Sequence, residues 1–353
     1  MKIIHIIWSF NIGGAETMLA NIASEQARMG EQVSLIIIND SYDTGLVESI
    51  DKKVKVKFLK RKPGSRSPLP IIWLNMILFW EQPSVIHCHV ASIINYLFKP
   101  LHKKTVLTMH TTGINYTHIT LNKYSKIFAI SDSVRVVLKE KFNIDAKTIM
   151  NGVVFDKMAN TKPPKLNNTF KIVSIGRLVD NIKGHSILIK AMHQIPKNIS
   201  ASVDIIGDGP DMSTLRSLCQ DLHIEERVRF LGAKSQIYIQ ENLCEYDLLV
   251  QPSFIEGFGL TIVEAMAAKV PVLVSDIDGT TEVICHGKYG VCFKVGDHYD
   301  LAKKIIEIIG NIDQCKRMAE DAYEYAMERY SLTSTAQKYI NNYTDLNENK
   351  KSI

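Results

Sequence analysis

The sequence has few cysteines, and none of them has a spacing typical of a metal site. Six cysteines occur in 353 residues, with no Cys-x2-Cys pair and no histidine cluster at zinc spacing. This argues against a zinc-binding domain, and we expect the cysteines to be small core residues of a reduced protein. The six are Cys88, Cys219, Cys244, Cys285, Cys292 and Cys315.

Long apolar runs and a large net charge are also missing. No stretch reaches the roughly 18 consecutive apolar residues that cross a bilayer. The N-terminal segment MKIIHIIWSF lacks the small-residue cleavage site of a signal peptide. We therefore expect a cytoplasmic protein. The formal net charge of +5 gives no case for nucleic-acid binding on charge alone, so no nucleic-acid partner is expected.

What the sequence does contain is a regular alternation of apolar and amphipathic segments. Short continuous apolar strands separated by helices predict βαβ units and a parallel sheet with both faces covered. Expected helices of the first half are Ala15–Met29, Ile71–Trp80, Ser92–Phe98 and Ser133–Phe142, and consecutive helices are expected from Leu301 to Asn341. Expected strands are Ile3–Trp8, Val33–Ile38, Val54–Leu59, Val85–His89, Thr105–Met109, Lys126–Ile130, Phe170–Ile175, Ala201–Ile206, Val228–Leu231, Leu248–Gln251 and Val270–Ser275.

The segment NTKPPKLNNT, residues 160–169, divides the chain. Its tandem prolines continue neither a helix nor a central strand, so it is predicted to be a linker. We expect an α/β fold of two Rossmann-like parallel-sheet domains facing across a cleft. Their bounds are 1–160 and 161–330, followed by a C-terminal segment 331–353. Ligands of such sheets bind beyond the carboxyl ends of the strands.

Gly13 and Gly14 follow the first expected strand and open a helix. Glycines there let the backbone approach a ligand, and free amides at a helix start favour an anion. The segment lacks the spacing of a dinucleotide fingerprint and the lysine of a phosphate loop. A tight turn in which Glu16 complements the helix dipole is the alternative.

Two cations lie on the strand-to-helix connection that opens the second half. Arg177 follows Gly176 just past the expected strand, and Lys183 lies where a helix begins. Together they suit a diphosphate, because charge-assisted hydrogen bonds are stronger than neutral ones. The alternative is that both are ordinary solvated surface cations.

The segment that contains Glu256 and Glu264 is the clearest indication of a ligand-binding site in the sequence. Gly257 and Gly259 force a loop before the helix that carries Glu264, so both carboxylates can converge on one ligand. Glu264 could chelate the vicinal hydroxyls of a ribose, while Glu256 could bind sugar hydroxyls or face a developing positive charge. Glu264 could instead merely cap or pair, but its helix is apolar nearly all round, where a lone carboxylate is costly unless satisfied.

Asp276 and Asp278 form an Asp-x-Asp pattern that suggests a metal site. No further ligand set accompanies it, so we expect no metal there. A loop that presents the amides of Gly279, Thr280 and Thr281 to a phosphate is the better interpretation.

Three histidines lie near expected strand ends. His87 and His89 point to one strand face, so metal binding is conceivable, but a satisfied core histidine is the better interpretation of His87. His110 is the one we expect to touch a donor sugar or leaving phosphate.

Together these motifs resemble the family 4 glycosyltransferases, retaining enzymes with the GT-B fold, over nearly the whole chain. The matching motifs are Gly13-Gly14-Ala15-Glu16, His110, Asn151-Gly152-Val153, Gly176-Arg177, Lys183-Gly184, Gly207-Asp208-Gly209-Pro210, Phe230-Leu231-Gly232, and Glu256 to Glu264 with Glu282 beyond. Asp278-Gly279-Thr280-Thr281 replaces the commoner Gly-Gly pair, so Thr280 could lend a hydroxyl as well as an amide.

The resemblance implies that the second domain binds the nucleotide sugar and the first faces the acceptor. Arg177 and Lys183 would bind the pyrophosphate and Glu264 the ribose. Glu256 and the backbone of Phe258, Gly259 and Leu260 would bind the transferred sugar. The Gly13-Gly14 loop would approach the phosphate, and the final helix would cross back to the first domain. The implied catalytic residues are Glu256, His110, Arg177 and Lys183, and the implied donor-binding set adds Gly13, Gly14, Gly176, Gly209, Phe258, Gly259, Leu260, Glu264 and Thr280.

The expected activity is retaining transfer of a hexosyl or N-acetylhexosaminyl group, from a UDP-linked donor in preference to a GDP-linked one. The acceptor would be a glycan or lipid-linked glycan of an envelope polysaccharide, with no metal or other cofactor. A nucleotide-sugar epimerase on the same fold and a non-catalytic nucleotide-sugar sensor are the alternatives.

The first domain also carries a basic segment beside an aromatic, apolar one. Two of the three tryptophans lie between Leu69 and Trp80. This pattern suits an anionic membrane surface, which would make the enzyme peripheral on the inner face of the plasma membrane. A helix buried on the sheet, with solvated lysines nearby, is the alternative. The basic residues are Lys52, Lys53, Lys55, Lys57, Lys60, Arg61, Lys62 and Arg66.

Overall fold

The computed structural model describes residues 1–155, 158 and 169–348, so the predicted linker lies almost entirely outside the described residues. The chain divides into two compact units. The first holds Met1–Gly152 together with the C-terminal helix α15 (Leu332–Glu348), and the second is Val153–Ser331. Each unit is described by itself.

The first unit is built on a parallel sheet in the strand order β3-β2-β1-β4-β5-β6-β7. Its central strands are buried except at the first residues of β1 and β2, as expected for a sheet covered on both faces. The two-residue strand β7 was not predicted. The strands are β1 (Lys2–Ile7), β2 (Gln32–Asn39), β3 (Lys55–Arg61), β4 (Val85–Cys88), β5 (Thr105–Met109), β6 (Lys126–Ala129) and β7 (Lys147–Thr148).

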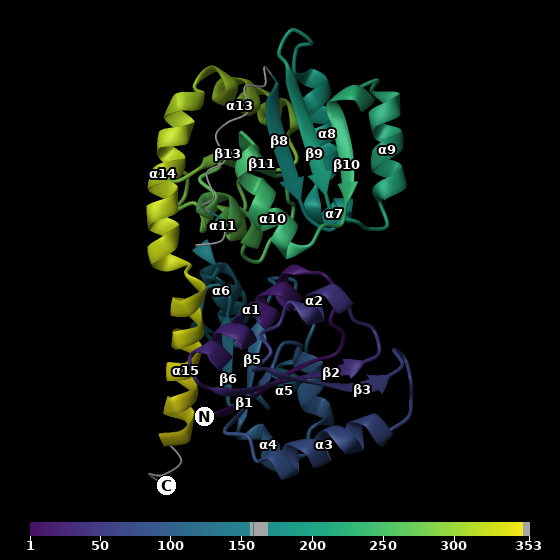
Figure 1. Ribbon diagram of the computed structural model, residues 1–353, viewed down its shortest axis with the longest axis vertical. Helices are drawn as coiled ribbons and strands as arrows, with labels where there is room; N and C mark the ends of the chain where they lie inside the picture. The colour runs from purple at the N-terminus through teal and green to yellow at the C-terminus, as the bar shows by residue number, and fades with distance from the viewer. Residues whose placement is uncertain (156–157, 159–168, 349–353) are drawn as a thin grey trace. The chain divides into compact units, whose positions relative to one another are not determined.

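The long helices of the first unit agree with the predicted ones, whereas the short helices α2, α4 and α5 were not predicted. Residues 91–96 form a 3-10 helix where an α-helix was expected over Ser92–Phe98. The Asn75 side chain donates to the Tyr96 carbonyl and accepts from the Phe98 amide, which ends this turn before Pro100. Helix α15 packs against α1 in this unit (Figure 1). The helices are α1 (Gly14–Arg28), α2 (Thr44–Glu48), α3 (Leu69–Glu81), η1 (Ala91–Tyr96), α4 (Lys99–His102), α5 (His118–Leu121) and α6 (Asp132–Phe142).

The second unit has a parallel sheet in the order β10-β9-β8-β11-β12-β13. The predicted strands are all present, and the unpredicted β13 adds an edge of only three residues. The strands are β8 (Phe170–Ile175), β9 (Ala201–Ile206), β10 (Val228–Gly232), β11 (Leu248–Gln251), β12 (Val272–Ser275) and β13 (Val291–Phe293).

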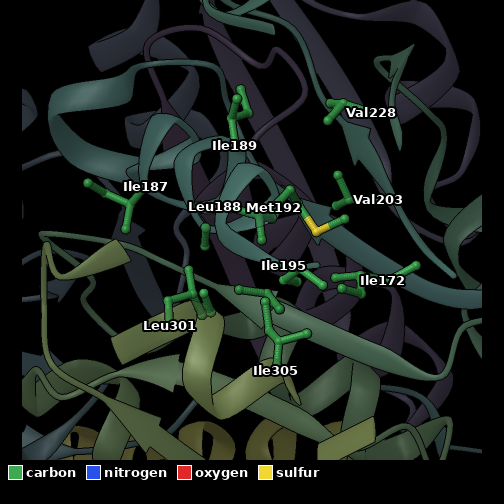
Figure 2. Close-up of a cluster of buried hydrophobic side chains, with 14 of the residues drawn as sticks. Ile172, Ile187, Leu188, Ile189, Met192, Ile195, Val203, Val228, Leu301 and Ile305 are labelled. Atoms are coloured by element: carbon green, nitrogen blue, oxygen red, sulfur yellow. The ribbon is translucent and has the colours of Figure 1, made fainter. Parts of the chain in front are cut away.

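One apolar core of the second unit lies between this sheet and the helices α8 and α13, which also pack on each other. Figure 2 shows Ile187, Leu188 and Met192 of α8 meeting Leu301 and Ile305 of α13 over the sheet. The helices are α7 (Asp180–Lys183), α8 (His185–Gln194), α9 (Met212–Asp221), η3 (Glu225–Arg227), α10 (Gln236–Asn242), η4 (Leu243–Glu245), α11 (Leu260–Ala267), α12 (Asp278–Thr281), α13 (His298–Gly310) and α14 (Ile312–Arg329).

Both sheets reverse their strand order at one point. In the first unit the reversal lies between β1 and β4, and in the second it lies between β8 and β11. Connections leave such neighbouring strands toward opposite faces, which opens a crevice at their carboxyl ends where ligands bind. The motifs predicted from the sequence follow these strands. Along the described residues, no helix is long and apolar enough to cross a membrane.

Candidate functional site

The loops at the carboxyl ends of β8, β9, β11 and β12 are held together by glycines. A Cβ atom at Gly209 would overlap the backbone of Leu178, and one at Gly279 would overlap the backbone of Glu256. These positions therefore need glycine for close backbone packing, which joins the loop after β9 to the loop after β8 and the segment after β12 to the loop after β11. The packing on Leu178 is sufficient reason for a glycine at position 209, with no ligand contact needed.

Lys183 and Glu256 meet at the reversal point of the second sheet. Lys183 ends α7 after β8, Glu256 lies in the loop after β11, and their Nζ and Oε2 atoms are 2.6 Å apart. Both side chains are largely buried, with 22% and 14% of their areas exposed. The other oxygen of Glu256 accepts a bond from the Gly257 amide at 3.2 Å. The carboxylate is thus fixed from two sides, and Lys183 is held with its ammonium in the same loop cluster.

The side chain of Gln251 contacts Glu256 of this pair. It is buried at the end of β11, and its amide nitrogen lies 3.4 Å from Oε2 of Glu256 and 2.8 Å from the Ser253 hydroxyl. Its carbonyl accepts a bond from the Thr261 hydroxyl at 3.0 Å. One amide therefore links the loop that carries Glu256 to the first turn of α11.

Glu264 lies inside α11 and is 3% exposed. Burial raises the pKa of its carboxyl from 4.5 to about 7, against the opposing effect of a 2.6 Å hydrogen bond from the Gln236 amide. Among the described residues, one side-chain amide, that of Gln236, donates to this buried carboxyl. A pair of ligand hydroxyls would supply the further donors that stabilise its ionised form.

Arg177 is exposed and follows Gly176 directly after β8. Within the described residues its guanidinium forms no ion pair and no hydrogen bond. The turn that carries it is well fixed, because the Gly176 amide donates to the Ile206 carbonyl and the Leu178 amide donates to the Asp208 carbonyl. An unengaged cation on a fixed turn is available to an anionic ligand.

Phe258, Gly259 and Leu260 form the start of α11. The Phe258 ring is buried against Tyr330, so only its backbone can serve a ligand. Gly259 is the N-cap residue with φ +80°, and no side chain caps the helix. The N-cap residue therefore provides no side-chain acceptor for the first amides of α11, and such amides at a helix start can bind an anionic or polar ligand.

Thr280 does not support the predicted ligand contact through its hydroxyl. The residue is fully buried, its hydroxyl bonds to the carbonyls of Ser275 and Ile277, and its amide also donates to Ile277. Both donors are therefore used inside the protein, where they tie α12 to the residues between it and β12. The Asp276 carboxylate accepts a bond from the Val295 amide at 2.7 Å.

The predicted residues of the first unit follow β1 and β5. Gly13 is the N-cap of α1 and receives no side-chain cap, and a Cβ on Gly14 would meet nothing within 4 Å. A Cβ on Gly13 would instead lie 2.5 Å from a carboxylate oxygen of Glu16. The Glu16 side chain therefore lies at the start of the helix, as in the tight-turn alternative, and the space open to a ligand is beside Gly14. His110 follows β5, and its Nδ1 atom is buried without a hydrogen-bond partner among the described residues.

His87 is a satisfied core histidine, as predicted. Its Nδ1 lies 2.6 Å from the Tyr343 hydroxyl and its Nε2 lies 2.7 Å from the Thr108 hydroxyl. His5, His87 and His89 place ring nitrogens within 4.8 Å of one another, which makes them a candidate metal group. However, His5 Nδ1 and His89 Nε2 are 3.0 Å apart and form a hydrogen bond with each other, so these two nitrogens are already paired within the protein.

Helix α3 has one buried face and one exposed face. One face, with Leu74, Ile77 and Leu78, is buried on the unit. The opposite face is exposed, and its tryptophans Trp73 and Trp80 stack edge to face at 5.6 Å between ring centroids. The exposed apolar residues are Leu69, Ile72, Trp73, Met76, Phe79 and Trp80.

Sequence analysis missed Gln251, Gln236 and the histidine His5. Gln251 ends a predicted strand, so a buried polar residue at a strand end was an available signal. Gln236 lies 28 positions before its partner Glu264, and no local pattern connects them. His5 pairs in register with His87 on the neighbouring strand, which requires the strand order that only the structure provides.

Comparison with known proteins agrees with this architecture. Residues 12–157 match the family described as "Glycosyltransferase Family 4", and residues 157–325 match "Glycosyl transferases group 1". The structure is similar to the crystal structure of Anabaena Alr3699/HepE in complex with UDP and glucose, with a TM-score of 0.83 at 23% identity over 98% of this chain and 100% of that chain.

Two curated relatives show the range of the family. N-acetyl-alpha-D-glucosaminyl L-malate synthase of Bacillus anthracis is 29% identical over 77% of this chain and 77% of its own length. Phosphatidyl-myo-inositol mannosyltransferase of Mycobacterium leprae is 27% identical over 95% of this chain and 94% of its own length.

The two parallel-sheet units have the architecture of the GT-B fold. The chain belongs to the family 4 glycosyltransferases, and the resemblance seen in its motifs is thereby confirmed.

Proposed function

We propose that this enzyme transfers a hexosyl or N-acetylhexosaminyl group from a UDP-linked sugar to a glycan or lipid-linked glycan acceptor. The reaction would retain the anomeric configuration and serve the assembly of an envelope polysaccharide such as a capsule, exopolysaccharide or O-antigen. The names of relatives support the sugar classes, since one is an N-acetylglucosaminyl L-malate synthase and another a phosphatidylinositol mannosyltransferase. The complex of a structural neighbour with UDP and glucose supports a UDP-linked donor.

The pairing of Lys183 with Glu256 beside the exposed Arg177 is the observation that carries this proposal. Charge grows on the diphosphate oxygens as the bond to the anomeric carbon breaks. Arg177 and Lys183 can stabilise that charge from fixed positions, which contributes about 10²–10³ in rate for one well-placed donor. Amides at the start of α11 and at Gly13-Gly14 of α1 would add to this stabilisation.

Glu264 and Glu256 would hold the two sugar rings of the donor. The buried Glu264 lacks enough donors for its ionised form, and a ribose diol provides two. Glu256 would accept hydroxyls of the transferred sugar or face the positive charge that develops at its anomeric carbon. His110 would contact the donor sugar or the leaving phosphate.

No metal or other cofactor is required in this scheme, because two cations and several amides serve the departing diphosphate. The leaving phosphate itself would accept the proton of the acceptor hydroxyl on the face where the new bond forms. Retention follows from attack on that same face without a covalent sugar–enzyme intermediate.

A donor panel tests the proposed function. The enzyme would be incubated with UDP-glucose, UDP-galactose, UDP-N-acetylglucosamine and GDP-mannose, with and without a lipid-linked glycan acceptor. We expect UDP release with one donor that depends on the acceptor, persists in EDTA, and gives a product whose anomeric configuration by NMR equals that of the donor. Conversion of a nucleotide sugar without acceptor would instead identify an epimerase, and binding without turnover would identify a sensor.

The exposed face of α3 would attach the enzyme to an anionic membrane surface. Six large apolar side chains of this helix are exposed, and they lie beside the strand β3, from which Lys55 and neighbouring basic residues extend. Apolar burial at the lipid boundary and about 1 kcal/mol per basic residue near the surface would act together. A lipid-linked acceptor would then be reached from that surface.

Flotation on vesicles tests this attachment. The protein is expected to float with phosphatidylglycerol vesicles and not with phosphatidylcholine vesicles. A Trp73→Ser, Trp80→Ser double variant should lose flotation, while Ile237→Ser, which removes an exposed apolar side chain of the second unit, should not. Failure of the unmodified enzyme to float on anionic vesicles would overturn the attachment and leave the transferase proposal intact.

A further inference from the structure

Four side chains of the first unit form an unbroken hydrogen-bonded chain that ends at His110. His5 Nε2 lies 2.8 Å from Gln26 Oε1, and His5 Nδ1 lies 3.0 Å from His89 Nε2. His89 Nδ1 in turn lies 3.1 Å from His110 Nε2. The chain crosses the reversal point of the sheet, from α1 through β1 to the residues that follow β4 and β5. Every ring nitrogen along it is engaged except His110 Nδ1.

Burial keeps the imidazoles of this chain neutral. It lowers the pKa of His5 and of His110 to about 4 and the pKa of His89 well below its usual range. A neutral imidazole has one nitrogen that donates and one that accepts, so each contact in the chain fixes the next. The proton positions can therefore be assigned by starting at Gln26.

The Gln26 amide is oriented with its carbonyl oxygen toward His5 and its Nε2 buried without a hydrogen-bond partner among the described residues. In this orientation the oxygen can only accept, so His5 donates from Nε2. His5 Nδ1 is then an acceptor and receives the proton of His89 Nε2. Because His89 carries its proton on Nε2, its Nδ1 is an acceptor and receives the Nε2 proton of His110. His110 Nδ1 is left as a buried acceptor with no partner among the described residues, which costs free energy until a ligand donates to it.

We propose that Gln26, His5 and His89 are positioning residues that hold His110 in its Nε2–H form, so that its Nδ1 accepts a hydrogen bond from a sugar hydroxyl. This inference rests on the proposed contact of His110 with the sugar. It adds a specificity rule, because an acceptor nitrogen selects a hydroxyl and disfavours an unprotonated phosphate oxygen in the same position. Of the two partners left open for His110, the chain therefore selects the sugar.

A second row of contacts holds the chain in place. His87 pairs in register with His5, and its ring lies 4.3 Å from the His89 ring between centroids. Hydrogen bonds to Tyr343 of α15 and to Thr108 of β5 fix the His87 ring, and the His89 ring packs against this fixed ring. The C-terminal helix thus supports the chain without belonging to it.

NMR of the protein labelled with ¹⁵N at histidine reads the proton positions directly, because a protonated ring nitrogen and a bare one have well-separated shifts. In the ligand-free enzyme we expect His5, His89 and His110 all to carry their proton on Nε2 between pH 6 and 8. His110→Gln would assign the His110 signals. A proton on His110 Nδ1 in the unmodified enzyme overturns the proposal whatever the activity, as does displacement of these resonances by added zinc or EDTA.

Variants of the positioning residues then test the consequence. His89→Phe keeps a ring but breaks the chain, and we expect His110 to become a mixture of tautomers and kcat/KM to fall about 10- to 100-fold, as for loss of other groups that orient a functional histidine. Gln26→Glu, which can only accept from His5, should retain the Nε2–H form of His110, whereas Gln26→Leu should not. His193→Gln, on an exposed histidine of α8, is the matched control and should leave both readouts unchanged.

The two proposals fail in different ways. If His110→Ala retains full transfer while the tautomers are as expected, the contact of His110 with the sugar is wrong and with it the purpose assigned to the chain. If His110→Ala is inactive but His89→Phe leaves both the tautomer and kcat/KM unchanged, the transferase role of His110 stands and the positioning proposal is wrong.

Discussion

Lys183 Nζ lies 2.6 Å from Glu256 Oε2, and the two residues come from the connections after the neighbouring strands β8 and β11. Each was predicted to contact a different part of the donor. Their pairing means that a bound diphosphate would share Lys183 with Glu256. The carboxylate orients the ammonium before the ligand arrives, so less side-chain entropy is lost on binding.

We expect Lys183→Ala to lower turnover at least about 100-fold, because it removes one preorganised donor to the leaving diphosphate and leaves Glu256 without its partner. Steady-state kinetics with the identified donor measures this. The variant should remain folded by circular dichroism. Near-normal transfer by Lys183→Ala would refute the assigned role.

Two controls separate catalysis from stability. Lys190→Ala removes a comparable lysine of α8 and should leave turnover unchanged. The swapped variant Lys183→Glu, Glu256→Lys can restore the ion pair and the melting temperature. It should remain inactive, because the charge that would face the diphosphate is displaced.

Arg177→Ala should weaken donor binding without lowering stability. The side chain is exposed and unengaged within the described residues, so the free energy of unfolding should change by no more than about 0.5 kcal/mol. Calorimetric titration with UDP should show a clear loss of affinity, and Arg177→Lys should recover part of it because the charge returns without the guanidinium fork. Arg216→Ala, on an exposed arginine of α9, is the control. Equal UDP affinity in Arg177→Ala and the unmodified enzyme would contradict a phosphate contact.

These residues show how far the sequence alone could lead. The strands were predictable because each is a short apolar run between helices, and the order of those runs implied parallel sheets. The sequence also identified candidate site residues, because charged side chains stand at strand ends or in an apolar helix. These candidates are Arg177, Lys183, Glu256 and Glu264. The edge strands β7 and β13 were missed, since two or three residues carry no readable period.

Other features depend on contacts between distant segments. Gln236 reaches Glu264, and Gly279 packs on the backbone of Glu256, only after the sheet has brought their loops together. Thr280 was expected to offer its hydroxyl to a ligand, but that hydroxyl is hydrogen-bonded to the carbonyls of Ser275 and Ile277. The local sequence was enough to propose candidate residues for the site. The residues that contact them could be identified only from the folded structure.

Glu264 should make stability depend on pH. Burial raises the pKa of its carboxyl from 4.5 to about 7, so folding favours the protonated form. Its stabilising contribution is complete below pH 4.5 and is lost as the pH rises through about 7, by roughly 3 kcal/mol at about 1.4 kcal/mol per pKa unit. Urea unfolding between pH 5 and 8 measures this loss.

Glu264→Gln should remove most of that pH dependence and be the more stable protein at pH 8, because an amide can accept from Gln236 without a buried charge. It should also bind UDP more weakly, since a neutral group is a poorer acceptor for two hydroxyls. Glu307→Gln, on a half-exposed glutamate of α13, is the control and should show the same pH dependence of stability as the unmodified protein. The same slope of stability against pH in both variants would show that Glu264 ionises normally.

Gly14→Ala tests the approach of a ligand to the start of α1. A Cβ there would meet nothing within 4 Å, so the added methyl should leave stability unchanged or raise it by no more than about 1 kcal/mol through helix propensity. If the diphosphate approaches this backbone, the methyl would occupy its path and kcat/KM should fall while the melting temperature does not. Gly279→Ala is the contrasting variant, because its Cβ would overlap the Glu256 carbonyl and should lower both stability and activity. Full activity in Gly14→Ala would show that open space beside this glycine is not occupied during the reaction, and would remove the Gly13-Gly14 loop from the proposed donor site.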